Sequence, residues 1–421
     1  GSLDLNNTVV INHYWINLYL AFNKKIQRQR FSCYIIYKDT YYDYTKKSTY
    51  IMHLIVNGYN LRGYPVGIAN VVINFINSIS KYDDVKITVA AFKDIPSCIT
   101  ERIVNRDNIS IKKIGFKNPF LWLFFSFVHF VNFHKADFLW SPTPIVPFFI
   151  RKNIRRLVTV HDFVSRDFRD TMTRAGRLVS ALVEPRAIKS ADFLWCVSDY
   201  TCERLKNYYP RRRSENIITG SAPDPFFKKT EQNKASRNFL SSIKISKDYI
   251  LFVGSLEPRK NLKFLLEIFA ELKRKKDLSL VVVGARKWGK TDIKDIINSD
   301  GFPKDDVIFT DFVSEDELRI LYNNALCYVS TSLNEGFGLP QAEAMKCECP
   351  VVSPYNSAMI EVVDGAGVTV KEWDKGVWVN SVLNAIKNRS EIIKKQNERI
   401  KNYSWDKVAQ KVYNVLKENL E

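Results

Sequence analysis

An apolar run that ends in a glycine-containing turn and continues as a helix occurs three times in this chain. The runs are residues 51–56, 250–253 and 327–330. Short, continuous apolar runs are typical of strands that are buried on both faces of a parallel sheet. Glycine lets the backbone of such a turn approach a ligand closely, and the helix N-terminus that follows attracts anions. The pattern therefore predicts parallel α/β domains that bind an anionic ligand at the strand ends.

The chain has 421 residues, which is enough for two domains of ordinary size. Strand and helix patterns alternate along most of the sequence, so we expect two Rossmann-like, doubly wound domains that face a central cleft. Glycine and proline residues followed by a polar stretch mark the link between the domains. The expected segments are an N-terminal extension at 1–48, a first domain at 49–222, a link at 223–248, a second domain at 249–402 and a last helix at 403–421.

The extension at residues 1–48 is rich in tyrosine and lysine, and neither a strand nor a helix pattern dominates it. An appended subdomain and an arm packed on the first domain both remain open. Gly1 and Ser2 are typical of an expression remnant, which also leaves open a preceding domain or targeting signal. The seven cysteines form no C-x-x-C pair, so a reducing compartment is expected.

The charge balance is strongly basic, with a formal net charge of +18. Such an excess implies an anionic partner: nucleotide phosphates, lipid headgroups or nucleic acid. The sequence contains no recognised nucleic-acid-binding motif, so we expect no nucleic-acid partner. No glycine fingerprint of dinucleotide-binding oxidoreductases follows a strand, which argues against that class of enzyme.

The third glycine turn lies between two carboxylates, Glu335 and Glu343. Pro340 fits the first position of the helix that follows, where its missing N–H costs nothing. Free amides at such a helix start can cradle phosphate, while carboxylates on either side can accept hydrogen bonds from sugar hydroxyls. A nucleotide sugar offers both groups. The expected amide cradle consists of Gly336, Phe337, Gly338 and Leu339.

The second glycine turn is followed by two cations, Arg259 and Lys260, at the predicted start of a helix. Cations oppose the helix dipole at that position, so the arrangement is unfavourable unless an anion lies between them and the helix. Arginine can grip phosphate oxygens in pairs and lysine acts as a point charge. We therefore predict that Arg259 and Lys260 clamp a diphosphate.

Together these turns resemble glycosyltransferase family 4, whose members are retaining enzymes of the GT-B fold. Glu335 and Glu343 match the family's E-x7-E motif, and residues 258–261 look like its Pro-Arg-Lys-Asn block. The segment Val-Thr-Val-His-Asp at 158–162 is similar to the family's His-Asp segment. The resemblance covers about residues 50–420 and is most specific in the second half. It implies that the last helix crosses back to the first domain.

The resemblance also implies roles for individual residues. Glu335 should hold hydroxyls of the transferred sugar, and Glu343 those of the ribose. His161 should face the donor sugar and leaving phosphate, with Asp162 shaping its loop. Ser255 stands where many members have arginine, which makes it a weaker phosphate ligand. The remaining candidates are Phe312 and Val313 for the nucleobase, and Gly63 and Gly67 for the acceptor side.

The expected activity is transfer of a hexose from a nucleoside diphosphate sugar to a glycan or lipid-linked acceptor. The resemblance favours GDP-mannose over UDP-sugars, as in bacterial mannosyltransferases of glycan assembly. No D-x-D triplet occurs, so neither a metal nor a cofactor is expected. Two alternatives keep the fold but change the reaction, namely a nucleotide-sugar epimerase and a phosphorylase-like enzyme. A basic nucleic-acid-binding protein is the remaining alternative.

Residues 119–133, which begin with Pro119 and end with Phe133, form an aromatic segment too short to span a bilayer. Several basic segments lie near it in the sequence. This combination is typical of docking on an anionic membrane face, and also of a buried helix beside a solvated basic surface. We expect a cytoplasmic protein, and both docking on the inner face of the membrane and a buried helix remain open. The basic residues are Arg151, Lys152, Arg155, Arg156, Arg166, Arg169, Arg174, Arg177, Arg211, Arg212 and Arg213.

Overall fold

The computed structural model describes residues 36–37, 40–41, 51–65, 67–168, 174–211, 217–284 and 293–420. The chain divides into two units, Gly1–Ile51 and Met52–Glu421. Within the first unit, the described residues form an antiparallel pair of β1 (Ile36–Tyr37) and β2 (Thr40–Tyr41). The rest of the predicted extension at 1–48 lies outside the described residues, as do Arg169, Arg212 and Arg213 of the predicted basic segments.

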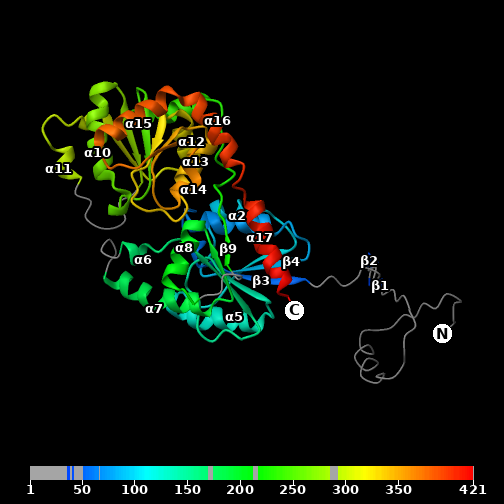
Figure 1. Ribbon diagram of the computed structural model, residues 1–421. Helices are drawn as coiled ribbons and strands as arrows, with labels where there is room; N and C mark the ends of the chain where they lie inside the picture. The colour runs from blue at the N-terminus through cyan, green and yellow to red at the C-terminus, as the bar shows by residue number, and fades with distance from the viewer. Residues whose placement is uncertain are drawn as a thin grey trace, which may run out of the picture. The chain divides into compact units, whose positions relative to one another are not determined.

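Two parallel sheets form the second unit, as the apolar runs predict (Figure 1). The sheet of the first domain has the strand order β5-β4-β3-β6-β7-β8-β9. The order reverses between β3 and β6, and open α/β sheets bind ligands at such switch points. The strands are β3 (Met52–Asn57), β4 (Val85–Ala91), β5 (Ile109–Lys113), β6 (Phe138–Ser141), β7 (Arg155–Val160), β8 (Phe193–Cys196) and β9 (Ile217–Thr219).

Helices cover both faces of the first sheet (Figure 1). The inner face of α2 (Ile68–Ile79) is buried in a core with β3 and β4. The helical segments are η1 (Gly58–Asn60), α2 (Ile68–Ile79), α3 (Ser97–Thr100), α4 (Pro119–Leu121), η2 (Trp122–Ser126), α5 (Phe127–Phe133), α6 (Val164–Asp167), α7 (Arg174–Ser190) and α8 (Asp199–Tyr208).

The second domain repeats this plan with the strand order β12-β11-β10-β13-β14-β15, so its switch point lies between β10 and β13. Both strands lead into glycine turns. The strands are β10 (Tyr249–Val253), β11 (Ser279–Val283), β12 (Val307–Asp311), β13 (Cys327–Val329), β14 (Val351–Pro354) and β15 (Val368–Val370). The helical segments are α9 (Lys234–Ser242), η5 (Pro258–Lys260), α10 (Leu262–Lys275), α11 (Lys294–Ile297), η6 (Lys304–Asp306), α12 (Glu315–Asn324), α13 (Leu339–Lys346), α14 (Met359–Val363), α15 (Lys375–Lys387), α16 (Arg389–Ile400) and α17 (Trp405–Glu418).

The link between the domains packs on the second domain. Phe227 and Leu240 are buried in one cluster with Tyr249 and Leu321. The apolar side chains of α9 thus extend the second core.

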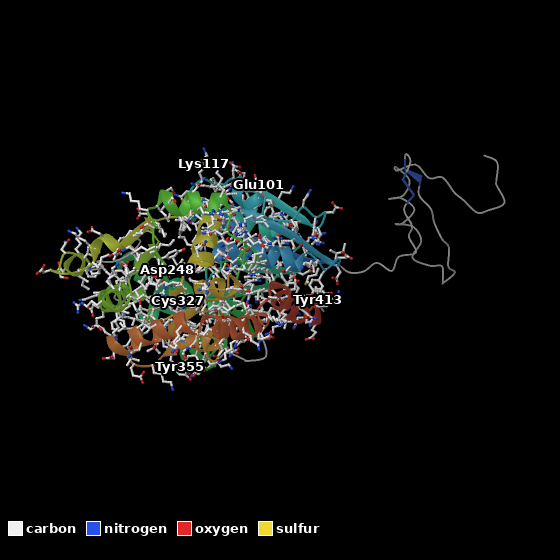
Figure 2. All side chains as sticks on the ribbon, turned by 90° about the horizontal axis from the view of Figure 1, so that it is seen from above. Glu101, Lys117, Asp248, Cys327, Tyr355 and Tyr413 are labelled. Atoms are coloured by element: carbon white, nitrogen blue, oxygen red, sulfur yellow. The ribbon has the colours of Figure 1, made fainter. Side chains whose placement is uncertain are left out.

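The last helix, α17, packs against α2 and so belongs to the core of the first domain (Figure 1). Its apolar stripe of Trp405, Val408, Val412 and Leu416 is buried there. Tyr413, labelled in Figure 2, stacks on Tyr82 with ring centroids 3.9 Å apart. This arrangement agrees with the expected crossing of the C-terminal helix.

The aromatic segment at 119–133 is helical throughout, with a π-helical turn in the middle. Asn118 caps it by accepting hydrogen bonds from the amides of Phe120 and Leu121. One side of the segment is buried, with Trp122 and Phe127 at 0% exposure. The opposite side leaves the rings of Phe120, Phe125 and Phe133 exposed.

Candidate functional site

A cavity of about 710 Å³ lies between the two domains at the carboxyl ends of their strands. The first domain contributes the loops after β3 and β7, and the second contributes those after β10, β12 and β13. Most predicted site residues line it, whereas Gly63 and Arg259 do not. The predicted residues in its lining are Gly67, His161, Asp162, Ser255, Lys260, Phe312, Val313, Glu335, Gly336, Phe337, Gly338, Leu339 and Glu343.

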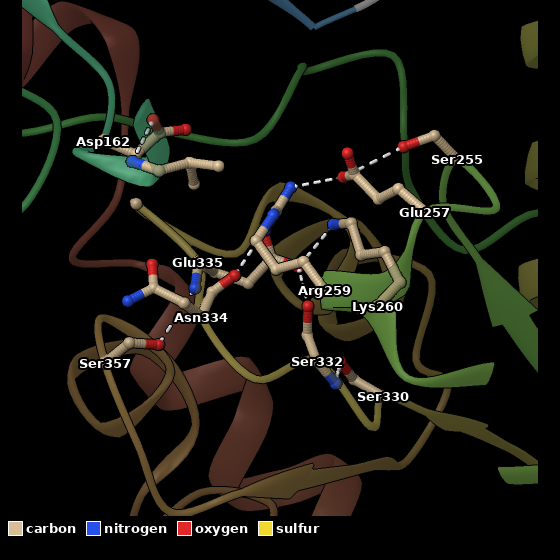
Figure 3. A network of polar contacts seen from close by, with 12 residues as sticks. Asp162, Ser255, Glu257, Arg259, Lys260, Ser330, Ser332, Asn334, Glu335 and Ser357 are labelled. Carbon is tan, nitrogen blue, oxygen red and sulfur yellow. Dashed lines mark hydrogen bonds and ion pairs between the residues drawn. The ribbon is translucent and has the colours of Figure 1, made fainter. Parts of the chain in front are cut away.

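Lys260 and Glu335 form a buried ion pair on the second-domain wall (Figure 3). Their relative exposures are only 9% and 8%. The Glu335 carboxylate also accepts hydrogen bonds from Ser332 Oγ at 2.7 Å and from the Arg259 guanidinium at 3.1 Å. Burial tends to raise the pKa of Glu335, but the charges of Lys260 and Arg259 dominate and lower it to about 2. Glu335 is therefore ionised at neutral pH.

Arg259 belongs to the same network but is not among the residues that line the cavity. Its guanidinium donates to Glu257 Oε1 at 2.6 Å, to Glu335 and to the carbonyl oxygen of Asn334. Glu257 Oε1 also accepts from Ser255 Oγ at 3.2 Å, which ties the glycine turn to Arg259. Arg259 thus connects the two loops that carry Lys260 and Glu335 (Figure 3).

The backbone before α10 keeps Arg259 and Lys260 away from the positive end of the helix dipole. Arg259 and Lys260 belong to a 3-10 turn, η5, which precedes α10. Asn261 ends that turn in the left-handed conformation, with a φ of 51°. The cations are thus held outside the first turn of α10, where the dipole would repel them most strongly.

The amide cradle before α13 requires its glycines. A Cβ on Gly336 would lie 1.7 Å from the carbonyl oxygen of His161 in the first domain. Gly338 is the N-cap residue of α13 and has a φ of 94°, which favours glycine. Pro340 was predicted at the first helical position but occupies the second, because α13 begins at Leu339. Phe337 is 6% exposed and packs edge-on against Tyr403, so its ring anchors the loop.

His161 follows β7 and lies across the cavity from the Lys260–Glu335 pair. Its Nε2 is 2.8 Å from the carbonyl oxygen of Pro142, which can only accept a hydrogen bond. Burial lowers the pKa of the ring, which favours the neutral imidazole with Nε2 protonated. Nδ1 is then a hydrogen-bond acceptor. Asp162 Oδ1 accepts from the amide of Val164 at 3.1 Å, so Asp162 shapes the loop as expected.

Glu343 lies one helical turn beyond the cradle and lines the same cavity. Its carboxyl accepts a hydrogen bond from the hydroxyl of Tyr322 at 3.3 Å. Burial is the main cause that raises the pKa of Glu343, to about 8, with the charge of Asp224 adding to it. The two carboxyl groups of the E-x7-E motif therefore differ in ionisation at neutral pH, because, among the described residues, cations contact Glu335 and not Glu343.

A cluster on one rim of the cavity connects the domains and was not predicted. Arg102 of the first domain binds Glu315 at the start of α12 with a 2.8 Å ion pair, and also binds Asp224 in the link. Asn70 donates to the same Glu315 at 3.0 Å. We call Arg102, Asn70, Glu315 and Asp224 the rim clasp. Arg102 follows no motif, so only the folded structure reveals its partners.

Aromatic rings meet on the same rim. Tyr64, from the glycine loop of the first domain, contacts Phe312 edge-on with centroids 4.5 Å apart. Phe312 and Val313 were predicted to hold a nucleobase, and both line the cavity at this end. The Tyr64 ring therefore covers this end of the cavity from the opposite domain.

On the opposite side of the cleft, α8 of the first domain contacts the second domain. Ser198 caps this helix by accepting a hydrogen bond from the amide of Thr201. The hydroxyls of Ser198 and Thr201 also donate to the carbonyl oxygen of Gly336, at 2.5 and 3.1 Å. Glu361 of α14 accepts from the amides of Asp199 and Tyr200, so a second-domain carboxylate satisfies the start of a first-domain helix.

Comparison with known proteins shows similarity to glycosyltransferases. Residues 237–412 match the family model described as glycosyl transferases group 1. The O-antigen chain mannosyltransferase B of Escherichia coli is 30% identical over 174 residues, 40% of this chain and 45% of that protein. The O-antigen chain mannosyltransferase RfbU of Salmonella typhimurium is 30% identical over 191 residues, 44% and 52% of the two chains. The chain thus spans about half the length of these curated relatives.

A solved structure matches a larger share of the chain than these relatives do. Anabaena Alr3699/HepE, in complex with UDP and glucose, superposes with a TM-score of 0.65 at 16% sequence identity. The match covers 87% of this chain and 99% of that one. Residues 52–421 therefore have the GT-B fold of glycosyltransferases, and the chain is similar to group 1 glycosyl transferases such as the O-antigen mannosyltransferases.

Proposed function

We propose that this protein is a retaining, metal-independent glycosyltransferase of family 4. It would transfer a hexose from a nucleoside diphosphate sugar to a hydroxyl of a glycan or lipid-linked acceptor. The observation that carries the proposal is the buried Lys260–Glu335 pair at the amide cradle of α13, facing His161 across the interdomain cavity. A cation, free amides and an ionised carboxylate together suit a diphosphate that is joined to a sugar.

In the proposed reaction, the bond between the anomeric carbon and the diphosphate breaks while the acceptor oxygen bonds to the same face of that carbon. The acceptor proton passes to the leaving phosphate. Lys260 and the cradle amides would stabilise the negative charge that grows on this group. Arg259 would contribute its charge at longer range, because Glu335 and Glu257 bind its guanidinium. Glu335 and Glu343 would hold sugar and ribose hydroxyls, respectively.

We propose GDP-mannose as the donor in preference to a UDP-sugar. Support comes from the relatives named as O-antigen mannosyltransferases, each about 30% identical over its matched region. The choice is open to a direct test, because a bound nucleotide stabilises the protein by mass action. The stabilisation is about 2.7 kcal/mol at a ligand concentration of 100 Kd.

A thermal-shift experiment with GDP, UDP, ADP and dTDP tests the donor site. GDP should raise the Tm most, and Lys260→Met should remove the shift. Lys113→Met, which breaks the exposed Lys113–Asp94 pair, is the matched control and should keep it. If none of the four nucleotides raises the Tm of the native protein, the proposed donor site is wrong.

Product analysis tests the reaction itself. Incubation of GDP-mannose without acceptor should give only slow hydrolysis, and NMR of a transfer product should show retained α configuration at the anomeric carbon. A new nucleotide sugar formed without acceptor would indicate an epimerase instead. Sugar 1-phosphate formed with inorganic phosphate would indicate a phosphorylase-like enzyme. Binding of a DNA duplex that weakens with salt, while nucleotides leave the Tm unchanged, would support a nucleic-acid-binding protein instead.

We further propose that the protein docks on the inner face of an anionic membrane through residues 116–152. The supporting rings are Phe120, Phe125 and Phe149, which are 63%, 58% and 87% exposed. Phe149 has a φ of 63°, a rare conformation for a bulky residue. Asn132 holds this backbone by bonding the carbonyl of Phe149 and the amide of Arg151, at 2.9 Å each.

The charge around these rings supports an anionic surface. Lys117 and Lys152 are exposed, and Lys117 projects from the surface in Figure 2. Arg155, Arg156 and Arg166 instead bond to other parts of the protein and are less available. Among the described residues, no helix is both long and apolar enough to cross a bilayer.

Vesicle sedimentation tests the membrane proposal. The native protein should sediment with phosphatidylglycerol vesicles and much less with phosphatidylcholine vesicles. Each ring that leaves water contributes about 1.5–3 kcal/mol, so a Phe120→Ser, Phe125→Ser, Phe149→Ser triple variant should bind at least about tenfold more weakly. Phe309→Ser, at a half-exposed ring of β12, is the control. Equal binding of the triple variant and the native protein would contradict the proposal.

A further inference from the structure

We propose that Arg62 is an anion-binding residue of the cavity and that it binds a phosphate group of the acceptor. The inference rests on the proposed transferase function and adds the chemical class of the acceptor, a phosphate-bearing lipid. Arg62 is exposed, follows η1 and lines the cavity from the first domain. Lys260, the proposed ligand of the donor diphosphate, lies on the second-domain wall of the same cavity.

Arg62 differs from the other cation in the cavity wall in its pairing with carboxylates. Two cations, Arg62 and Lys260, are among the described lining residues. Lys260 is paired with Glu335. Within the described part of the chain, no carboxylate lies in ion-pair distance of Arg62, so its charge is the one in the wall without an acidic partner. The lining carboxyl groups are Asp162, Asp311, Glu315, Glu335 and Glu343.

Aromatic contacts hold Arg62 in place without using its hydrogen-bond donors. The guanidinium carbon lies over the ring of Tyr59, 3.9 Å from its centroid. Tyr59 is itself fixed, because its amide donates to the side chain of Asn57 at 3.1 Å and its ring packs on Phe92 and Trp122. A guanidinium over an aromatic ring keeps its N–H groups available for a phosphate, which arginine can bind with two parallel hydrogen bonds.

The same contacts point to the acceptor as the source of the phosphate. Trp122 belongs to the aromatic segment whose outer rings we propose to enter the membrane. A lipid-linked acceptor bound at this segment would lie next to the first-domain contacts that hold Arg62. The donor diphosphate already has Lys260 and the amide cradle of α13. An uncharged acceptor would leave the Arg62 charge without a partner in the loaded cavity.

Two probes of different origin distinguish the sources of phosphate. Farnesyl phosphate represents the acceptor, with farnesol as its uncharged counterpart, and GDP represents the donor. Calorimetry should show tighter binding of farnesyl phosphate than of farnesol to the native protein. Arg62→Gln should weaken farnesyl phosphate binding at least about tenfold, as expected for loss of a hydrogen bond between charged groups. Arg62→Lys should retain part of the affinity, while GDP and farnesol binding should not change.

Arg106→Gln, at another exposed arginine of the first domain, is the matched control and should bind farnesyl phosphate like the native protein. Equal Tm values for the variants would establish that they fold. The proposal is wrong if Arg62→Gln leaves farnesyl phosphate binding unchanged. It is also wrong if Arg62→Gln weakens GDP instead, because Arg62 then serves the donor. If GDP does not bind the native protein, the proposed function is wrong. The comparison of farnesyl phosphate with farnesol would still test whether Arg62 binds a phosphate group.

Discussion

Gly336 and His161 touch through their backbones across the two domains. A methyl group on Gly336 would lie 1.7 Å from the His161 carbonyl oxygen, a distance that no real Cβ can adopt. The carbonyl of Gly336 in turn accepts hydrogen bonds from Ser198 and Thr201 of the first domain. The amide cradle and the histidine loop are thus held together by a contact that tolerates no side chain.

Gly336→Ala should separate these loops and reduce transferase activity at least about hundredfold, since misplacement of reacting groups by about 1 Å can cost that much. Initial-rate measurements with saturating donor and acceptor provide the test. Gly376→Ala in the first turn of α15 is the control, because the nearest atom to the new Cβ is a carboxylate oxygen of Asp374 at 3.2 Å. Native activity in Gly336→Ala would show that the contact is dispensable.

Removal of either member of the Lys260–Glu335 pair should destabilise the fold, because the other charge remains buried. Lys260→Met and Glu335→Gln should each lower the free energy of unfolding by about 3–5 kcal/mol. The double variant should be more stable than either single variant, yet all three should lose at least about hundredfold in transfer rate. Urea unfolding and initial rates provide the two readouts. Additive losses of stability would mean that the two side chains do not interact.

Glu343 should make stability fall as the pH rises. Its pKa is about 8 in the folded protein, against 4.5 for an ordinary glutamate, because of burial and the charge of Asp224. Between these values the folded state holds a proton that the unfolded state has released, so folding is progressively disfavoured up to about pH 8. Glu343→Gln should flatten this part of the profile of unfolding free energy against pH. An unchanged slope would show that Glu343 is ionised in the folded protein.

The rim clasp should limit how far the cleft opens. Arg102→Ala removes the ion pairs of the first domain with Glu315 and Asp224, so small-angle scattering should give a larger radius of gyration. Glu315→Gln should have a smaller effect, because Asp224 still binds Arg102. Arg106→Ala serves as the control for loss of a first-domain arginine. A radius that is equal in all variants would mean that other contacts, such as Tyr64 with Phe312, hold the domains.

The fold could be read from local sequence, because buried parallel strands are continuous apolar runs. The apolar runs at 51–56, 250–253 and 327–330 agree with β3, β10 and β13 to within one residue at each end. The strands that escaped prediction lie at sheet edges: β5 is mostly exposed, and β15 has only three residues. Neither has the continuous apolar pattern that marks a central strand.

The site was predictable where a motif lies within a single loop and hidden where side chains meet from distant segments. The cradle from Gly336 to Leu339 and the position of Lys260 follow from glycine turns after apolar strands. The direction of the Arg259 side chain depends on Glu257 and Asn334, and no local rule reveals that choice. Arg102 and Glu315 are 213 residues apart in the chain, so their contact exists only once both domains have folded.

The packing of α17 has a consequence for synthesis on the ribosome. The first domain buries Trp405, Val408, Val412 and Leu416, although its sheet is complete at Thr219. The apolar surface of α2 therefore stays exposed to solvent while some 200 further residues are translated. The cores of the second domain are completed by α16, which precedes α17 in the chain, so the second domain can fold before the core of the first domain is covered.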